Sequence, residues 1–243
     1  MKRQRLDKAL IRKGLVLSRE RARALIMEGK VLVDGIAVTK AGSLVREDSL
    51  ITLREPDIPY VSRGGLKLEA ASERFGISFE GKVAMDVGVS TGGFTDYMLR
   101  HGAERVYAID VGYGQIDWRL RNDPRVVLLE RTNIRHLKAL PEAIDIATID
   151  VSFISLRLVL PKILEFLKPN GEIVALFKPQ FEVGRENVSK GGIVKDDAAR
   201  ISALESMRGF IEELGLEELG TIESPIKGRK GNIEYLIYMR KRQ

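Results

Sequence analysis

The sequence contains no cysteine and only two histidines among its 243 residues. The absence of cysteine excludes disulfides, thiolate catalysis and zinc sites built on cysteine, and it is compatible with a reducing compartment. His101 and His136 have no ligand or catalytic-triad partner in the surrounding pattern, so we interpret both as structural.

Long apolar runs are also absent. No segment approaches the roughly 20 consecutive apolar residues that a transmembrane helix needs. The first residues, MKRQRLDKAL, have the charge of a secretory signal but no uninterrupted apolar stretch. We therefore expect a cytoplasmic protein that is neither exported nor inserted into a membrane. A hydrophobic content of 44 % still suffices for a core, and the length allows one large and one small domain.

The net charge of +6 is distributed unevenly. Residues 1–58 contain 13 Lys or Arg and 8 Asp or Glu, whereas the remaining 185 residues contain 27 and 26. A small basic module is thus joined to a nearly neutral one. This asymmetry suggests a polyanionic partner for the first part, although a solvated basic face is the simpler explanation.

Residues 1–58 are predicted to form two helices packed on a small sheet. The first helix is predicted from an apolar stripe made by Leu6, Ala9, Leu10 and Leu15. Ser18 is a suitable N-cap for a second helix that runs to about Glu28. The segment KVLVDGIAVT alternates around Asp34–Gly35 and predicts a two-residue hairpin, and SLITLRE predicts a closing strand.

Basic side chains cover much of these helices and could neutralise several phosphates. The candidate RNA contacts in this module are Arg3, Arg5, Lys8, Arg12, Lys13, Arg19, Arg21, Arg23 and Lys30. The segment RLDKALIRKGLVLSRERARALIMEGKVLVDG resembles the RNA-binding module named after the fourth protein of the small ribosomal subunit. That resemblance implies a helix pair and a hairpin that lie on structured RNA; a basic solubility module is the alternative.

The segment EPDIPYVSRGG, with its prolines and glycines, predicts a linker. We place the linker at residues 59–65 and a second domain at residues 66–243. Six apolar runs in that domain predict a mostly parallel sheet of the Rossmann-like α/β class: VAMDVG, RVYAIDVG, RVVLLE, IDIATIDVS, EIVALFKP and EYLIYMR. The first four end on or near Asp86, Asp110, Glu130 and Asp150, which predicts a ligand crevice at the carboxyl edge.

The turn after the first of these strands predicts a cofactor site. Gly88, Gly92 and Gly93 permit a tight turn, and a helix that starts near Gly93 would point free N–H groups into the crevice. The spacing is not G-x-G-x-x-G, which disfavours nicotinamide dinucleotides. Asp86, so close to the turn, would repel a pyrophosphate and suits a cationic amine or a sulfonium.

Two further residues fit a nucleoside. Asp110, at the end of the second strand, is placed to accept both hydroxyls of a ribose. Asn133 could read an adenine edge, or it could simply form a turn. A nucleoside with a positive centre and no pyrophosphate describes S-adenosylmethionine well, although not uniquely.

Four residues are candidates for catalysis. Asp150 and Lys178 end two strands, and Lys67 begins a helix just before the sheet. Glu234 precedes the last strand and reaches the same edge only if that strand is antiparallel. A lysine whose pKa is lowered by a neighbouring cation can deprotonate a ribose hydroxyl, so Lys178 is our candidate base, with Lys67 as the cation and the two acids fixing geometry. No metal is needed. Taken singly, each residue could be a solvated strand end or a cap.

The motifs DVGVSTGGFTD, AIDVGYGQIDWRLRNDPRVVLLERTNIR, DVSFISL, FKPQFEVG and GNIEYL resemble the TlyA family along nearly the whole chain. The resemblance implies an RNA-binding module joined to an FtsJ-like 2′-O-methyltransferase domain, whose mostly parallel sheet has its last strand pair antiparallel. It maps a Lys-Asp-Lys-Glu catalytic tetrad onto Lys67, Asp150, Lys178 and Glu234. The cofactor residues that it implies are Asp86, Gly88, Ser90, Thr91, Gly92, Gly93, Phe94 and Asp150.

The resemblance further implies methylation of a cytidine ribose in ribosomal RNA. The short end after the last strand favours members that act on the large subunit alone, and we expect a monomer. Two alternatives stay open at this point. One is a ribosome-assembly factor with a vestigial methylase domain, and the other is a haemolysin, which the missing signal and membrane span argue against.

Two polar loops could hold a substrate strand or could be ordinary surface loops. FEVGRENVSKGGIVKDD follows Lys178, and SPIKGRKGN precedes Glu234. The candidate RNA contacts outside the basic module are Arg63, Lys227, Arg229 and Lys230.

Overall fold

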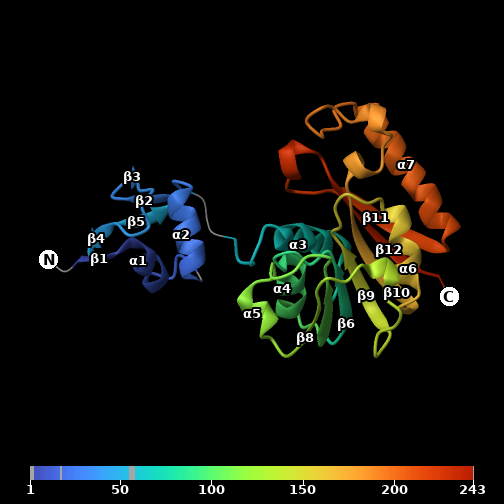
Figure 1. Ribbon diagram of the computed structural model, residues 1–243, viewed down its shortest axis with the longest axis horizontal. Coiled ribbons are helices and arrows are strands. Elements are labelled where there is room, and N and C mark those ends of the chain that lie inside the picture. Colours follow the sequence, from blue (N-terminus) through green and yellow to red (C-terminus); the bar gives the residue numbers. More distant parts are fainter. Residues whose placement is uncertain (1–2, 17, 55–57, 243) are drawn as a thin grey trace. The chain divides into compact units, whose positions relative to one another are not determined.

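The computed structural model describes residues 3–16, 18–54 and 58–242 (Figure 1). Contacts between residues divide the chain into two compact units, Met1–Pro59 and Tyr60–Gln243. Each unit has a hydrophobic core of its own.

The described residues of the N-terminal unit form two helices and five short strands. In chain order they are β1 (Arg3–Arg5), α1 (Leu6–Arg12), α2 (Arg19–Met27), β2 (Val31–Val33), β3 (Ile36–Ala37), β4 (Leu44–Arg46) and β5 (Ile51–Leu53). Strands β3, β2 and β5 form one antiparallel sheet, and β1 pairs with β4. The two helices, the hairpin and the closing strand are as predicted. Strands β1 and β4 were not predicted, because RQR has no apolar residue and LVR does not alternate between apolar and polar residues.

Local chemistry accounts for the boundaries of these elements. The Ser18 side chain accepts a hydrogen bond from the Arg21 backbone N–H at 3.1 Å and caps α2. Asp34 and Gly35 have φ values of 50° and 83°, the left-handed geometry that a tight hairpin turn requires. Leu15 lies beyond the end of α1, contrary to the predicted stripe, and packs against the core from the following turn.

The second unit is built on a seven-stranded sheet in the order β11-β12-β10-β9-β6-β7-β8. Its strands are β6 (Val83–Val87), β7 (Arg105–Ile109), β8 (Val126–Leu129), β9 (Ile144–Ile149), β10 (Leu167–Phe177), β11 (Leu216–Glu223) and β12 (Tyr235–Lys241). Strands β8, β7, β6, β9 and β10 are parallel, whereas β12 is antiparallel to both β10 and β11. The predicted sheet is confirmed. Strand β11 was missed because LEELGTIE has too few apolar residues to mark a buried strand.

Helices cover both faces of this sheet (Figure 1). They are α3 (Gly64–Phe75), α4 (Gly93–Arg100), α5 (Trp118–Arg121), α6 (Leu160–Leu164) and α7 (Asp197–Glu213). The described part of this unit also forms five 3-10 turns: η1 (Ile134–His136), η2 (Leu156–Leu158), η3 (Pro179–Phe181), η4 (Arg185–Asn187) and η5 (Arg229–Gly231).

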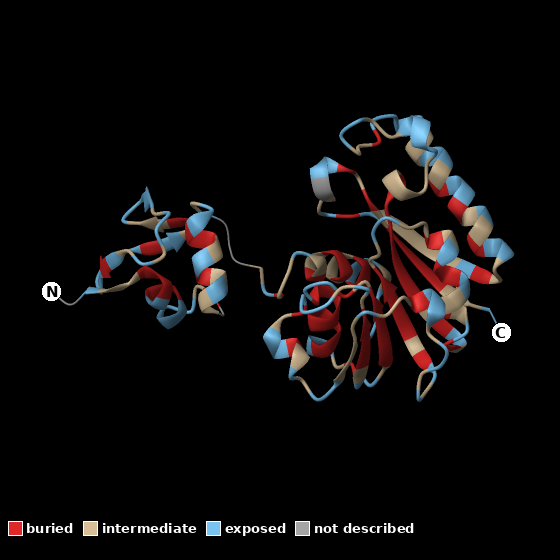
Figure 2. Cartoon of the chain, in the orientation of Figure 1, coloured by how far each residue is buried: buried red, intermediate tan, exposed pale blue. Residues whose placement is uncertain are grey.

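The central strands are buried on both sides, as Figure 2 shows. Met85 of β6 belongs to the core cluster that includes residues of α6 and α7, and the neighbouring Ala84 belongs to the cluster that includes residues of α3 and α4. Successive residues of one strand face opposite sides of a sheet. The continuous apolar runs in the sequence therefore reflect a sheet sandwiched between two helix layers.

The segment predicted as a linker differs in the structure. Tyr60 is only 7 % exposed and packs in the core of the second unit, with its ring 5.5 Å from that of Tyr97. The Val61 backbone N–H donates to Asp96 at 2.8 Å, and α3 already begins at Gly64. Residues 60–65 are thus part of the second unit. Proline and glycine content marks a break in regular structure, but it does not reveal that an adjacent aromatic ring is buried.

None of the described helices is long and apolar enough to span a membrane.

Candidate active site

The four residues predicted as catalytic lie at the carboxyl edge of the parallel strands. Asp150 follows β9 and Lys178 follows β10. Strand β12 is antiparallel to β10 and its first residue, Tyr235, pairs with Phe177, the last residue of β10. Glu234, just before β12, therefore lies beside Lys178, just after β10. Lys67 comes from the first turn of α3.

These residues form two ion pairs. Lys178 Nζ lies 2.6 Å from Asp150 Oδ1, and Lys67 Nζ donates to Glu234 Oε2 at 2.7 Å. Lys178 also donates to the Ser152 hydroxyl at 3.0 Å. Both lysines and Glu234 are buried, with exposures of 9 %, 8 % and 3 % for Lys67, Lys178 and Glu234. Burying such charges is tolerable only when each has an opposite charge at contact distance, as here.

The turn after β6 brings backbone groups close to this edge. Gly88 has a φ of 88°, and a Cβ at this position would lie 2.4 Å from the Asp150 carbonyl oxygen. At Gly93, a Cβ would lie 2.4 Å from Ser62 Oγ and 2.8 Å from the Gly65 backbone nitrogen. Gly92 is the N-cap of α4. Only residues without a side chain allow β6, β9, α3 and α4 to approach so closely around the turn.

Asp86 lies beneath this turn rather than on an open surface. Its Oδ2 accepts hydrogen bonds from the backbone N–H and the hydroxyl of Thr95, at 3.0 and 2.6 Å, and its Oδ1 accepts one from Thr148 at 3.2 Å. The residue is 1 % exposed, and burial raises the pKa of its carboxyl to about 7. We predicted a carboxylate facing a bound cation, whereas the observed carboxyl holds the first turn of α4 against β6.

Asp110 ties the turn to the loop after β7. Its two carboxylate oxygens accept from the backbone N–H groups of Ser90 and Gly112, both at 2.7 Å. Each oxygen retains a second acceptor site. The side chain is partly exposed, so it can still receive the hydroxyls of a ribose.

The other predicted cofactor residues divide into surface, core and turn positions. Thr91 is exposed at the turn, whereas Phe94 is 3 % exposed and packs in the core. Asn133 caps η1, because its side-chain oxygen accepts from the Arg135 backbone N–H at 3.1 Å. The turn-forming alternative for Asn133 is therefore present, and the adenine-reading role of its amide stays a prediction.

Comparison with known proteins agrees with this architecture. Residues 60–241 match the model of FtsJ-like methyltransferases, and residues 4–51 match that of the S4 domain. A 16S/23S rRNA (cytidine-2′-O)-methyltransferase, TlyA of Mycobacterium tuberculosis, is 44 % identical over 244 residues, which cover 98 % of this chain and 90 % of the relative. The chain belongs to the TlyA family of FtsJ-like methyltransferases.

Other members of the TlyA family carry a different kind of name. Hemolysin A of Brachyspira hyodysenteriae is 44 % identical over 96 % of this chain and 98 % of the relative. A solved structure from Streptococcus thermophilus, described as that of a candidate hemolysin, superposes with a TM-score of 0.78 at 41 % identity, covering 100 % of this chain and 90 % of that chain. The names thus differ while the two-domain fold is shared.

In this TlyA-family chain, a buried acid organises part of the basic module. Asp7 is 0 % exposed and accepts hydrogen bonds from Arg5 and Arg19, each at 3.0 Å, while Arg23 lies 3.7 Å away. These guanidinium groups hold the pKa of the Asp7 carboxyl well below its usual range. Asp7 contacts the guanidinium groups of these arginines, but their side chains are half-exposed, so they can still bind a phosphate.

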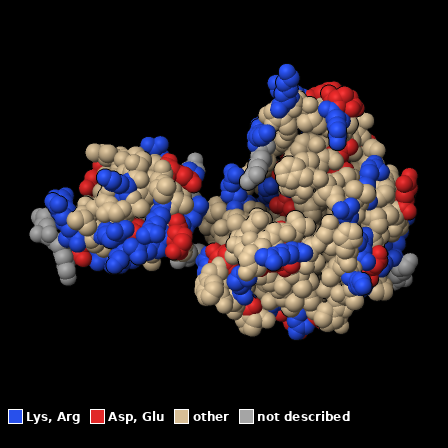
Figure 3. Space-filling model, in the orientation of Figure 1, with Lys and Arg blue, Asp and Glu red and all other residues tan. Residues whose placement is uncertain are grey.

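The remaining candidate RNA contacts are mostly surface residues. Figure 3 shows Lys and Arg side chains grouped on the N-terminal unit. Arg3, Lys8 and Lys13 are exposed. Arg12 and Lys30 form ion pairs with Glu47 at 2.9 Å and Glu28 at 3.1 Å. In the second unit, Arg63, Lys227 and Lys230 are exposed, whereas the side chain of Arg229 lies outside the described part of the chain.

One residue near the tetrad was not predicted. Phe153 is 86 % exposed, and its φ is 63°, an uncommon conformation for a bulky residue. Its ring centroid lies 5.3 Å from that of Phe181, and the residue directly follows Ser152, which contacts Lys178. An aromatic side chain directly after the polar residues at a strand end was the available signal in DVSFISL.

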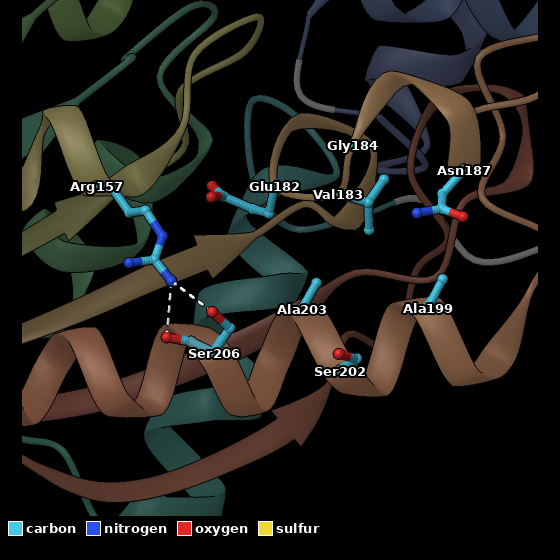
Figure 4. Close-up of a pocket in the computed structure, with 9 residues that line it drawn as sticks. All are labelled: Arg157, Glu182, Val183, Gly184, Asn187, Ala199, Ser202, Ala203 and Ser206. Carbon is cyan, nitrogen blue, oxygen red and sulfur yellow. Dashed lines mark hydrogen bonds between the residues drawn. The ribbon is translucent and has the colours of Figure 1, made fainter.

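A cavity of about 450 Å³ lies beside α7, where Arg157, Glu182, Asn187, Ser202 and Ser206 are among the lining residues (Figure 4). Arg157 donates to the backbone and the hydroxyl oxygens of Ser206 at 2.7 and 2.9 Å. Glu182 accepts from the Ser155 hydroxyl at 2.6 Å and from the Leu156 backbone at 2.8 Å, and burial raises its pKa. The tetrad does not line this cavity. Among the described residues, no group of three or more acids or histidines is arranged to hold a metal ion.

Proposed function

We propose that this chain transfers a methyl group from S-adenosylmethionine to a ribose 2′-hydroxyl of ribosomal RNA, with a cytidine as the modified nucleotide. The observation that carries the proposal is the pair of buried ion pairs, Lys178–Asp150 and Lys67–Glu234, beside the glycine turn. The name of the Mycobacterium relative supports the reaction and the nucleotide. The S4 domain at residues 4–51 supports RNA as the substrate.

The residues at the turn fit an adenosyl cofactor. The approach of β6 to β9 leaves no room for a Cβ at Gly88, so the backbone itself lines the site. The first N–H groups of α4 and the carboxylate of Asp110 are the groups that would hold the methionine and ribose portions. When bound, S-adenosylmethionine supplies a methyl group on a positively charged sulfur.

The tetrad has to activate and orient a poor nucleophile. The pKa of a ribose hydroxyl lies far above neutrality, so a general base contributes strongly. In its ion pair with Asp150, Lys178 is an ammonium, so it must release one proton before its amine can accept that of the ribose hydroxyl; Asp150 fixes the direction of Nζ. Lys67 and Glu234 hold the other side of the site, and alignment of the oxygen with the methyl group supplies much of the remaining acceleration.

Two other functions are distinguishable from this one. A ribosome-assembly factor with a vestigial methylase domain requires no intact tetrad, yet all four tetrad residues are present and paired here. A haemolysin, as in the name of the Brachyspira relative, must act on a membrane, and leakage of purified lipid vesicles at low protein concentration would support that function.

The large ribosomal subunit is the substrate that we propose, acted on by a monomer in the compartment that holds ribosomes, the cytoplasm. The Mycobacterium relative is named for both 16S and 23S rRNA, so both subunits belong in the assay. Sedimentation of the purified chain alone and with each subunit tests the monomer and the preferred partner together.

The deciding experiment is transfer of tritiated methyl from S-adenosylmethionine to isolated small subunits, large subunits and free ribosomal RNA. Labelled RNA is then mapped for ribose methylation. Label on a cytidine 2′-oxygen is the expected result. If the protein binds S-adenosylmethionine but labels none of the three substrates, the assembly-factor function gains support instead.

A further inference from the structure

A buried asparagine joins the two polar loops that flank the tetrad. Asn232 is 3 % exposed and lies two residues before Glu234. Its side-chain NH₂ donates to the Gly192 carbonyl at 2.9 Å, and its side-chain oxygen accepts from the Val194 backbone N–H at 3.0 Å. One side chain thus satisfies a backbone acceptor and a backbone donor of a loop 40 residues away in sequence.

The loop that contains Asn232 also encloses the Glu234 carboxylate. The Asn232 carbonyl accepts from the Gly228 backbone N–H at 2.8 Å, and the Glu234 carbonyl accepts from Ser224 at 2.8 Å. A Cβ at Gly228 would lie 1.9 Å from Glu234 Oε1, so the backbone of this loop packs directly on the carboxylate. The conformation of residues 224–233 therefore determines the position of the Glu234 carboxylate.

Each loop also carries exposed positive charge. Lys190 and Lys195 flank the segment that Asn232 binds, and Lys227 and Lys230 lie in the loop of Asn232 itself. Lysines held on one rigid unit lose less conformational freedom when they bind phosphates than lysines on two independent loops. Joining the two loops would therefore increase the affinity of these lysines for an RNA strand bound next to the tetrad.

We propose that Asn232 is a positioning residue that makes residues 189–195 and 224–233 a single unit, which aligns Glu234 and presents four lysines to the substrate RNA. This inference deepens the proposed methyltransferase function and rests on it. Asn232 acts through the two loops and through Glu234; it does not contact the reacting atoms.

The chemistry of the side chain suggests the decisive variant. Asn232→Asp keeps the shape and the acceptor for Val194, but it removes the donor to Gly192 and places a negative charge against that carbonyl. Because leaving a buried polar group unpaired destabilises the joined loops, we expect KM for the ribosomal substrate to rise and kcat to fall by a combined factor of about ten to a hundred. S-adenosylmethionine binding, measured by calorimetry, should change less than about twofold, because the turn at Gly88 is not part of this unit.

A matched control exists at the opposite end of the sheet. Asn170 is exposed in β10, remote from the tetrad, and has a φ of 60°, which asparagine and aspartate both tolerate. Asn170→Asp introduces the same charge and should leave KM and kcat unchanged. Wild-type values of KM and kcat in Asn232→Asp would overturn the proposal.

A measurement on the unmodified protein tests the joined loops even if the variant does not fold. The amides of Val194 and Gly228 should exchange hydrogen with the same opening free energy, because one unit opens as a whole. Opening equilibria that differ by more than about tenfold would contradict a single unit. If the wild-type chain methylates no ribosomal RNA, the proposed function fails, whereas hydrogen exchange still decides whether Asn232 joins the loops.

Discussion

Lys178 Nζ and Asp150 Oδ1 lie 2.6 Å apart across the carboxyl ends of β10 and β9. The same two strands carry a second such pair near their amino ends, where Lys168 donates to Asp145 at 2.7 Å. Both pairs link the same two strands, but only the first lies beside the glycine turn. Comparing variants of the two ion pairs therefore distinguishes a catalytic role from a purely structural one.

Replacing Lys178 by alanine should abolish methyl transfer, with a loss of about 10²–10⁴-fold expected for removal of a general base. Binding of S-adenosylmethionine should be largely intact. The measurement is tritium incorporation under single-turnover conditions, with Lys168→Ala as the matched control. Full activity in Lys178→Ala would remove the proposed base, and equal losses in both variants would indicate a structural effect only.

The Lys67–Glu234 pair should behave as a coupled unit in unfolding. Lys67→Met leaves Glu234 buried without its cation, and breaking a buried pair in this way costs about 3–5 kcal/mol. Adding Glu234→Gln should recover part of that loss. Urea unfolding of the two single variants and the double variant measures the coupling. The surface pair Lys162–Glu165, with its partners 2.6 Å apart, serves as the comparison and should show less than about 1 kcal/mol.

Asp86 should make the protein less stable as the pH rises. Burial raises the pKa of its carboxyl to about 7, so the folded protein retains a proton that the unfolded chain releases near pH 4. Between these values the folded state binds more protons, and the free energy of unfolding therefore falls with increasing pH. Asp86→Asn removes the titration while keeping an acceptor for Thr95. Relative to wild type, this variant should gain stability from about pH 4 to about pH 7, by several kcal/mol.

The difference between the two urea unfolding curves isolates Asp86, because the other titrating groups, including Glu182, are present in both proteins. A difference that does not change with pH would show that the Asp86 carboxyl is not titrating in this range.

Phe153 should contribute to RNA binding and not to folding. The residue is 86 % exposed beside the tetrad, and its ring can stack on an unpaired base of the substrate, an interaction worth about 1–3 kcal/mol. Phe153→Ala should therefore raise KM for the ribosomal substrate about ten- to a hundredfold. The melting temperature and S-adenosylmethionine affinity should be unchanged.

Ile201 provides the control for Phe153. It is 55 % exposed on α7, and Ile201→Ala removes exposed apolar surface, although less than Phe153→Ala does, without touching the tetrad. An equal effect of the two substitutions on KM would assign the loss to surface hydrophobicity rather than to stacking.

Much of the fold was readable from the sequence because its signals are local. The apolar runs that became β6, β7, β8, β9, β10 and β12, the Ser18 cap and the Asp34–Gly35 turn each depend on a few neighbouring residues. Strand β11 and the burial of Tyr60 were not readable. The polar strand β11 is held by pairing with β12, and Tyr60 is held by a ring that comes from α4.

For the site, the sequence by itself determined which residues stand at strand ends and turns, because strand periodicity and glycine spacing are properties of adjacent residues. Only the tertiary structure decided how they pair. Lys67 meets Glu234 across 167 residues, and the meeting depends on the direction of β12 and on the packing of α3. The enclosure of Asp86 and the joining of two loops by Asn232 likewise arise from burial, which removes water as a partner and obliges each polar group to find one within the protein.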